Sequence, residues 1–156
     1  MDLNFNLHKK QLEVFKSKAR FKIVAAGRRA GKSYLSAVTL LIEALKEYNR
    51  FGIPLKGKEV WYVAPTYQQA RDIIWGLLKD MGQEVIEQVY ENTSTMRLIN
   101  GRTIKLKGSD RPDTLRGVSL AYVRRRTDDA TSQHHSLIKY TPSGGVKVYG
   151  LKFQLT

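Results

Sequence analysis

The stretch FKIVAAGRRAGKSYLSAVTLLIEALKE, residues 21–47, decides the fold that we expect for this chain. Residues 21–26 form a short apolar run with β-branched side chains, which predicts a buried strand. Further along, apolar residues recur at helical spacing and predict an amphipathic helix: Leu35, Val38, Leu41, Ile42, Leu45 and Tyr48. The sequence therefore predicts a strand, a glycine-containing loop and a helix in direct succession.

The loop AGRRAGKS, residues 26–33, fits the phosphate-loop pattern when an alanine takes the place of the usual first glycine. Gly27 and Gly31 let the backbone turn tightly and bring N–H groups against phosphate oxygens. Lys32 can reach the β- and γ-phosphates of a nucleotide, and the Ser33 hydroxyl suits a Mg²⁺ ligand. The alternative is a plain turn with a chance Lys-Ser pair, which the flanking strand and helix disfavour. We expect a chain that binds a nucleoside triphosphate, or that descends from one that did.

The composition is that of a globular protein of about one domain. The chain has 156 residues, of which 42% are hydrophobic and 10% aromatic. There is no cysteine, which excludes a disulfide framework and a zinc-thiolate site. The start, MDLNFNLHKK, lacks the apolar core of a signal peptide, and no run reaches membrane-spanning length. We therefore expect a soluble cytoplasmic protein that does not contact a membrane.

The charge is strongly unbalanced. Lys and Arg number 27 against 14 Asp and Glu, which gives a formal net charge of +13. Such an excess favours a polyanionic partner, with nucleic acid as the first candidate. A basic surface that is merely solvated is the alternative.

Two further regions predict regular structure around this unit. Residues 7–19 read as a short basic helix that carries Gln11. Residues 59–64 read as a strand, and Thr66 then caps a helix that Gly82 ends. The apolar stripe of that helix consists of Ala70, Ile73, Ile74, Leu77, Leu78 and Met81. A second strand–turn–helix unit beside the first predicts a parallel α/β sheet.

From residue 85 the pattern changes to short strands. These are expected at residues 85–90, 95–99, 103–107 and 118–123. Asn100-Gly101 predicts a two-residue hairpin turn, and residues 108–116 a polar loop. Farther on, residues 130–139 show no pattern, whereas residues 146–155 predict one more strand.

The order of four segments resembles the ATPase domain of large terminase subunits, the motors that pump DNA into the procapsids of tailed bacteriophages. The segments are GRRAGKS, WYVAPTYQQARDIIW, LINGRTIKLKGS and DTLRGVSLAYV, and the resemblance covers roughly residues 7–123. It implies a P-loop NTPase fold of the RecA/helicase-like α/β type, with a mostly parallel sheet flanked by helices and a β-hairpin near Asn100. It also implies ATP and Mg²⁺ as cofactors and double-stranded DNA as partner. For an intact relative it implies a portal, a small terminase subunit and a homo-oligomeric ring.

The resemblance also implies roles for individual residues. The loop residues expected to contact the nucleotide are Gly27, Arg28, Arg29, Ala30, Gly31, Lys32 and Ser33. Arg28 matches the arginine inside the terminase loop, which is thought to act on the γ-phosphate as an arginine finger in cis, although packing or DNA contact is the alternative. Gln11 matches a glutamine that reads the adenine edge. Tyr67, Gln68 and Arg71 match positions that couple nucleotide to DNA, or are ordinary surface residues.

The sequence departs from the family after Val123. In terminases the equivalent strand ends in an Asp-Glu pair that holds Mg²⁺ and activates water, whereas here three arginines, residues 124–126, follow. We expect these arginines to end the strand, because unpaired buried charge is costly. Asp128 and Asp129 come after this break, so ATP is expected to bind but to be hydrolysed very slowly.

The expected organisation is a partial P-loop ATPase domain in residues 1–123 and a divergent tail in residues 124–156, without the nuclease domain of terminases. A truncated gene, a frameshift or a recombination junction near residue 124 would each produce this pattern. Two alternative functions remain at this point. The chain is either a non-catalytic nucleotide- or DNA-binding fragment, or another helicase-like ATPase.

Overall fold

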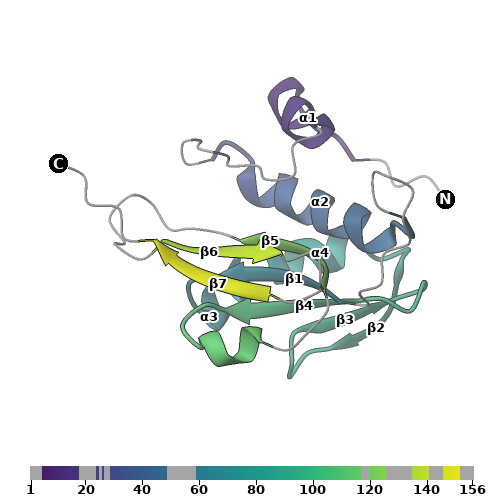
Figure 1. Cartoon of the computed structure of the whole chain (residues 1–156). Coiled ribbons are helices and arrows are strands. Elements are labelled where there is room, and N and C mark those ends of the chain that lie inside the picture. The colour runs from purple at the N-terminus through teal and green to yellow at the C-terminus, as the bar shows by residue number, and fades with distance from the viewer. Residues whose placement is uncertain are drawn as a thin grey trace.

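A computed structural model of the chain describes residues 5–17, 24, 26, 29–48, 59–116, 120–125, 135–140 and 146–151. The helices are α1 (Lys9–Lys16), α2 (Lys32–Leu45), α3 (Tyr67–Ala70), the π-helical η1 (Arg71–Trp75), α4 (Gly76–Met81) and the 3₁₀-helix η2 (Pro112–Leu115). The strands are β1 (Glu59–Ala64), β2 (Ile86–Tyr90), β3 (Thr95–Leu98), β4 (Thr103–Gly108), β5 (Leu120–Arg125), β6 (His135–Tyr140) and β7 (Val146–Leu151). Figure 1 shows α2 lying over the main sheet and α1 lying on the outer side of α2.

The main sheet has five strands in the order β2-β3-β4-β1-β5. β1 pairs in parallel with both neighbours, so that Tyr62 lies opposite Leu106 of β4 and Arg124 of β5. The β2–β3 and β3–β4 pairs are antiparallel. β6 and β7 form a separate antiparallel pair. The predicted α/β sheet with flanking helices is therefore confirmed.

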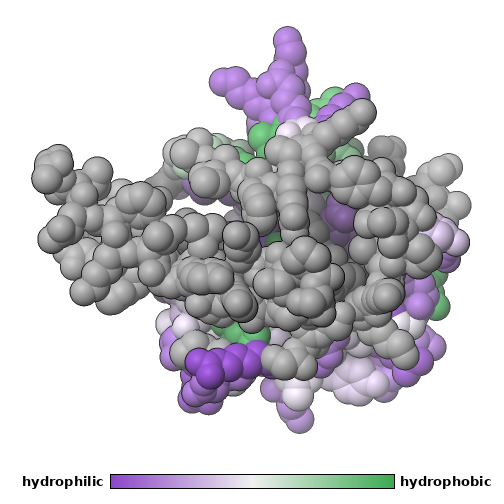
Figure 2. Space-filling view, viewed as in Figure 1, coloured by the Kyte–Doolittle hydropathy of each residue, from purple (hydrophilic) through white to green (hydrophobic). Residues whose placement is uncertain are grey.

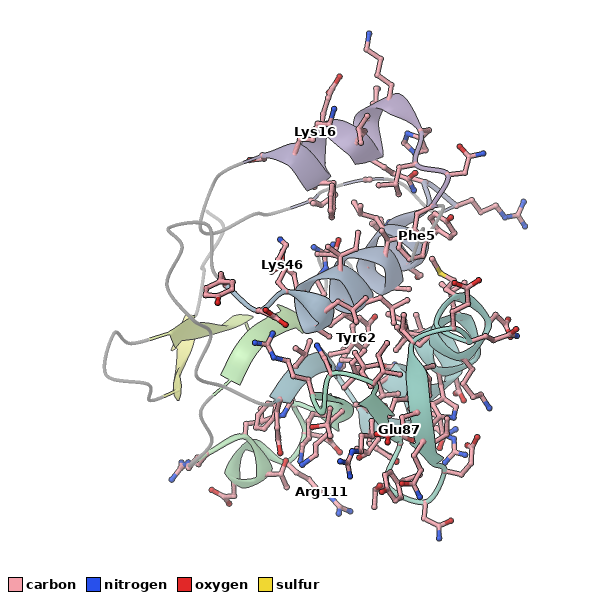
Figure 3. The ribbon with its side chains drawn as sticks, turned by 90° about the vertical axis from the view of Figure 1, so that its right-hand side faces the viewer. Phe5, Lys16, Lys46, Tyr62, Glu87 and Arg111 are labelled. Atoms are coloured by element: carbon pink, nitrogen blue, oxygen red, sulfur yellow. The ribbon has the colours of Figure 1, made fainter. Side chains whose placement is uncertain are left out.

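One hydrophobic core joins α2, the α3–α4 segment and one face of the sheet. The strand β1 contributes alternate residues, Val60, Tyr62 and Ala64, because successive side chains of a strand point to opposite faces. Figure 3 shows Tyr62 between α2 and the sheet. The helical members are Ala37, Leu40, Leu41, Ala44, Ala70, Ile74, Trp75 and Leu78. Since these residues share one cluster, α2 and α3–α4 lie on the same face of β1.

The helical segment after β1 begins and ends as the sequence predicts. The Thr66 hydroxyl accepts a hydrogen bond from the Gln69 amide at 3.2 Å and caps α3. The Gly82 amide donates a hydrogen bond to the Leu78 carbonyl at 2.9 Å, and α4 ends there. The π-helical turn η1 interrupts the segment without ending it, which the apolar spacing did not indicate.

The hairpin at Asn100-Gly101 is present, but its turn differs from the prediction. The Leu98 amide donates to the Arg102 carbonyl at 2.8 Å, and the Gly101 amide donates to the Leu98 carbonyl at 2.8 Å, so three residues form the loop. Only Gly101 has a left-handed backbone, with φ 78°, whereas a two-residue turn of this type needs two such residues. The Asn100 amide instead donates to the Ala44 carbonyl at 2.9 Å and fastens the hairpin to α2.

Three expectations about segment ends are wrong. α2 ends at Leu45, because Lys46 is extended, so Tyr48 lies beyond the helix and is 54% exposed. β5 continues past Val123 through Arg124 and Arg125, because β5 is the outermost strand in the described part of the sheet and Arg124 finds a polar partner on α2. Residues 130–139, expected to lack a pattern, contain most of β6.

The predicted strand at residues 21–26 falls largely outside the described residues, because only residues 24 and 26 of it are described. The predicted strand at residues 146–155 is confirmed for residues 146–151. None of the helices in the described ranges combines the length and the apolar character needed to cross a membrane.

Candidate functional site

The described end of the glycine loop leads directly into α2. Gly31 is the N-cap residue of this 14-residue helix and has a left-handed backbone, with φ 72° and ψ 20°. Arg29 is also left-handed, with φ 61°. Among the residues that the structure describes, no side chain caps α2, and the first turn of α2 contains no acidic residue. The first backbone N–H groups of α2 therefore combine with the positive end of the helix dipole to favour an anion.

Lys32 lies at the start of α2 and reaches back over the loop. Its ammonium group donates a hydrogen bond to the carbonyl of Ala26, at the other end of the loop. This contact holds the positive charge across the turn that the sequence predicts to surround a phosphate. Ser33 follows in the first turn and is half-buried, and Ala30 is exposed. Gly27 and Arg28 lie outside the described residues.

Gln11 joins α1 to this loop. Only 6% of its surface is exposed. Its carbonyl oxygen Oε1 accepts from the His8 amide at 3.0 Å, and its Nε2 donates to the Gly31 carbonyl at 3.0 Å. A Cβ atom at Gly31 would lie 2.4 Å from that Nε2. Gly31 is therefore required both by its backbone conformation and by the close approach of Gln11.

The structure thus places Gln11 beside the loop, with both polar atoms of its side-chain amide bonded to the protein. The capping arrangement with His8 could have been read from the sequence, because residues three apart meet at a helix start. The contact with Gly31 joins residues 20 apart and carries no local signal. A contact of Gln11 with adenine remains a prediction.

Arg124 is the residue near the loop that sequence reasoning missed. It lies on β5, is half-buried, and its Nε donates to the Ser36 hydroxyl of α2 at 3.2 Å. The Ser36 hydroxyl in turn donates to the Lys32 carbonyl at 2.8 Å. The run of arginines is the sequence signal here, but it predicts the end of the strand and not a contact with α2.

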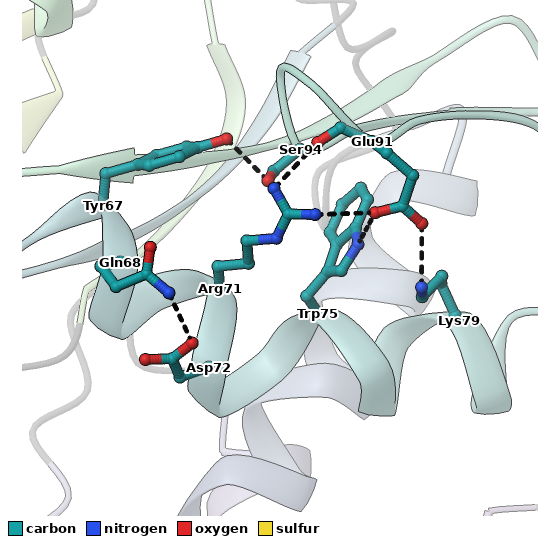
Figure 4. A network of polar contacts seen from close by, with 8 residues as sticks. All are labelled: Tyr67, Gln68, Arg71, Asp72, Trp75, Lys79, Glu91 and Ser94. Carbon is teal, nitrogen blue, oxygen red and sulfur yellow. Dashed lines mark hydrogen bonds and ion pairs between the residues drawn. The ribbon is translucent and has the colours of Figure 1, made fainter.

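The three residues proposed to couple nucleotide to DNA do not form one group. The Tyr67 hydroxyl donates to the Ser94 hydroxyl at 2.7 Å, and Gln68 donates to Asp72 at 2.8 Å. Arg71 instead forms an ion pair with Glu91, shown in Figure 4. All three side chains are therefore engaged within the protein, and their coupling role remains a prediction.

Glu91 is the centre of a polar network on the β2–β3 turn. Its carboxylate accepts from Lys79 at 2.9 Å, from the Trp75 indole at 2.8 Å and from Arg71 at 3.0 Å (Figure 4). The hydrogen bond from Lys79, followed by that from Trp75, lowers the pKa of Glu91 below the ordinary glutamate value of 4.5. The network fastens the turn to the helical segment. Its partners are 12 to 20 residues from Glu91, so no sequence motif identifies it.

The outer helix α1 has a basic and hydrophilic surface. Figure 2 shows hydrophilic side chains at the top of the molecule, where Figure 1 places α1. Lys9, Lys10 and Lys16 of this helix are exposed, which agrees with the predicted basic helix. The α1 surface is thus a candidate contact for a polyanion.

Comparisons with known proteins point to one family. The chain is 30% identical over 142 residues to the terminase large subunit of Thermus virus P23-45, and 29% identical over 143 residues to that of Thermus phage G20c. Each match covers 78% of this chain and 27% of the relative, so the chain spans about a quarter of the length of these curated relatives. No family model matches the chain.

The solved ATPase domain of the Thermus phage P74-26 large terminase is similar in structure. The match has a TM-score of 0.61 at 27% sequence identity and covers 79% of this chain and 54% of that one. The resemblance to large terminase subunits is therefore confirmed, together with the P-loop-type α/β fold.

Proposed function

We propose that this chain is the ATP-binding part of a DNA-packaging motor, equivalent to the ATPase domain of a phage large terminase subunit. One observation carries the proposal. Gly31 is left-handed at the uncapped start of α2 and is followed by Lys32, in a chain 27% identical to a solved large terminase ATPase domain. This combination of backbone and side chain suits the phosphates of a nucleotide.

Each loop residue has a proposed role. The N–H groups of the first turn of α2 hold the phosphate oxygens, and the Lys32 ammonium leaves the Ala26 carbonyl to contact the β- and γ-phosphates. Ser33 would hold Mg²⁺, which would supply positive charge to offset the charge of the phosphates. Arg28 acts on the γ-phosphate in cis, and Gln11 positions the loop from α1 and reads the adenine edge.

Double-stranded DNA is the proposed substrate of the motor, with a portal, a small terminase subunit and a ring of copies as its assembly. The exposed lysines of α1 support a contact with DNA phosphates. Hydrolysis is proposed to be slow. β5 continues into Arg124 and Arg125 beside β1, where the family places the acid pair that completes the catalytic site.

Equilibrium binding of a fluorescent ATP analogue tests the proposal. Replacing Lys32 with alanine should weaken binding at least about tenfold, because a charge-assisted contact with phosphate is lost. Lys79→Ala is the matched control, since it removes the same charge from a partly exposed residue of α4. Equal binding by wild type and Lys32→Ala would contradict the proposed site.

Phosphate release from ATP, measured on the same samples, tests the proposal that hydrolysis is slow. Binding that depends on Lys32 without appreciable release supports a motor domain that does not turn over, which is also the behaviour of a non-catalytic fragment. Ordinary motor turnover, abolished by Lys32→Ala, would show that the chain supplies its own acid and that slow hydrolysis is wrong.

A further inference from the structure

The β3–β4 hairpin contacts the end of α2 that lies farthest from the glycine loop. The Arg102 guanidinium donates hydrogen bonds to the Lys46 carbonyl and, at 3.5 Å, to the Glu43 carbonyl. The Asn100 side-chain amide donates to the Ala44 carbonyl at 2.9 Å, and its oxygen accepts from the Arg102 amide at 3.1 Å. Two residues of one hairpin therefore bond three carbonyls at the C-terminal end of α2.

Arg102 also brings positive charge to this end of the helix. A helix leaves its last carbonyls without partners inside the helix, and its dipole favours a cation there. The last turn of α2 contains no basic residue of its own, and Lys46, which follows it, is paired with Glu43 at 2.5 Å. Arg102 is only 9% exposed, and a cation at that depth is costly unless it is bonded. The charge that the helix end favours thus comes from a hairpin residue 56 positions farther along the chain.

These bonds restrict movements of α2 that apolar packing resists less well. Apolar contacts are non-directional, and packed helices can slide past one another by small amounts. Successive carbonyls point about 100° apart around a helix axis, so bonds to Glu43 and Ala44 resist rotation as well as sliding. α2 has 14 residues and is about 21 Å long, and a shift along its axis at the hairpin end is carried to the loop end.

The loop end of α2 is the end that such a shift would affect. Hydrogen bonds from N–H groups to phosphate oxygens weaken steeply when distance and angle change. The first N–H groups of α2 and Lys32, which we propose to hold the phosphates, move with the helix. Gln11 bonds the Gly31 carbonyl at 3.0 Å at this end. Gln11 and the hairpin thus hold the two ends of one helix.

We infer that Arg102 is a positioning residue of the nucleotide site, which acts through α2 and does not touch the ligand. The inference rests on the proposed nucleotide site and deepens it. Arg102 sets where the first turn of α2 presents its N–H groups to the polyphosphate of a nucleoside triphosphate. Asn100, which is exposed, assists from the same hairpin.

Equilibrium binding of a fluorescent ATP analogue tests the inference. Arg102→Met keeps an aliphatic stem and removes the donors, and it should weaken binding about fivefold. Arg102→Lys returns one charged donor and should bind within about twofold of wild type. Val63→Ala is the control, because Val63 is buried and does not belong to the core cluster that contains α2. It should lose stability and bind like wild type.

Urea unfolding of the same variants separates positioning from a general loss of stability. A variant that is about 90% folded changes its apparent dissociation constant by only about a tenth through unfolding. A fivefold loss in a folded variant therefore reports a change in the native site. If Arg102→Met does not fold, Asn100→Ala takes its place. It changes an exposed residue, removes the bond to Ala44 and should weaken binding about threefold.

A double-mutant cycle with Lys32→Ala shows whether the effect travels along α2. The two side chains belong to opposite ends of the helix, and substitutions at such a separation ordinarily have additive effects. Here Arg102→Met should weaken binding less than about twofold in the Lys32→Ala protein, because a main phosphate contact of the shifted helix start is already lost.

The outcomes separate this inference from the proposed function. Wild-type affinity in Arg102→Met, or in Asn100→Ala where it takes that place, would overturn the positioning role and leave the loop site intact. An equal loss in a Val63→Ala protein of the same stability, or full additivity in the cycle, would do the same. Binding that is unaffected by Lys32→Ala would instead overturn the loop site itself.

Discussion

Two regions of this molecule handle positive charge in opposite ways. On the β2–β3 turn, Arg71 and Lys79 both contact the carboxylate of Glu91, so charges of opposite sign meet within the chain. At the start of α2, Lys32 contacts the Ala26 carbonyl and Arg124 contacts the Ser36 hydroxyl. The first region is a structural clamp, complete in itself. The second lies at the helix start that we propose to bind phosphate.

Substituting Gly31 in the second region should have the largest effect on stability. Gly31→Ala forces an L-residue into φ 72° and brings its Cβ to 2.4 Å from Gln11 Nε2. We expect a loss of about 2 kcal/mol in unfolding free energy, from backbone strain and the displaced hydrogen bond. Urea unfolding measures this loss, and binding of the ATP analogue should weaken in parallel.

Substitutions at two other glycines separate the cost of backbone strain from the cost of the displaced hydrogen bond. Gly101 also has a left-handed backbone, with φ 78°, but a Cβ there would meet nothing within 4 Å. Gly101→Ala should therefore lower the unfolding free energy by about 1 kcal/mol, from backbone strain alone. Gly76→Ala, inside a helical segment and equally unobstructed, should stabilise by up to about 1 kcal/mol. If Gly31→Ala cost no more than Gly101→Ala, Gln11 would not constrain the loop.

Gln11→Ala should have an intermediate effect on the same region. It leaves the Gly31 carbonyl and the His8 amide without this partner, which should cost about 1 kcal/mol and loosen α1 from the loop. Hydrogen exchange of the α1 amides measures the loosening. Glu13→Ala, an exposed change on the same helix, is the control.

Nucleotide preference shows how Gln11 acts. If Gln11 only positions the loop, ATP and GTP should lose affinity equally in Gln11→Ala. A selective loss for ATP would show instead that its amide reads adenine, and that nucleotide replaces the bonds to His8 and Gly31.

The smallest effect is expected in the clamp. Glu91→Gln removes the charge that Arg71 and Lys79 share, but this region is exposed, where ion pairs contribute little. The pKa of Glu91 is lowered in the folded protein, so its contribution to stability is present above its unfolded pKa and is lost as pH falls through the folded pKa. The stability difference between wild type and Glu91→Gln should therefore be present at pH 7 and shrink below about pH 4.5.

Nucleotide binding should be the same in Glu91→Gln and in wild type, because the cations of the clamp are engaged with Glu91 within the chain. Glu84→Gln, another exposed carboxylate, is the control for the pH series. A clear loss of nucleotide affinity in Glu91→Gln would show that the two regions are coupled, and the contrast between them would no longer hold.

The elements that local patterns specify could be predicted from the sequence. The strand β1 agrees with the prediction residue for residue, because a short apolar run before a proline suits a buried strand. The cap at Thr66 and the start of α2 after Gly31 follow from backbone chemistry that involves only neighbouring residues. The hairpin was located correctly, but its turn type depended on Asn100, whose side chain bonds to Ala44 of α2 instead.

The residues of the candidate loop are contiguous in the sequence, whereas their distant partners are visible only in the structure. Lys32 and Ser33 belong to a contiguous motif, so their spacing is visible in the sequence. Arg124 lies 88 residues from Ser36, and only the parallel pairing of β5 with β1 brings it to α2. We expected the arginines to end the strand because buried charge is costly, yet the strand continues where its position in the sheet gives Arg124 a hydroxyl partner.

The sequence by itself determined the glycine loop, the helix behind it, the strand β1 and the family resemblance, because each depends on residues close together in the chain. Only the tertiary structure decided that Gln11 holds the Gly31 carbonyl, that Glu91 gathers Arg71 and Lys79, and that Arg124 faces the start of α2. These contacts join residues 12 to 88 positions apart. Pairing at such distances is set by the order of strands and the packing of helices, which no local pattern records.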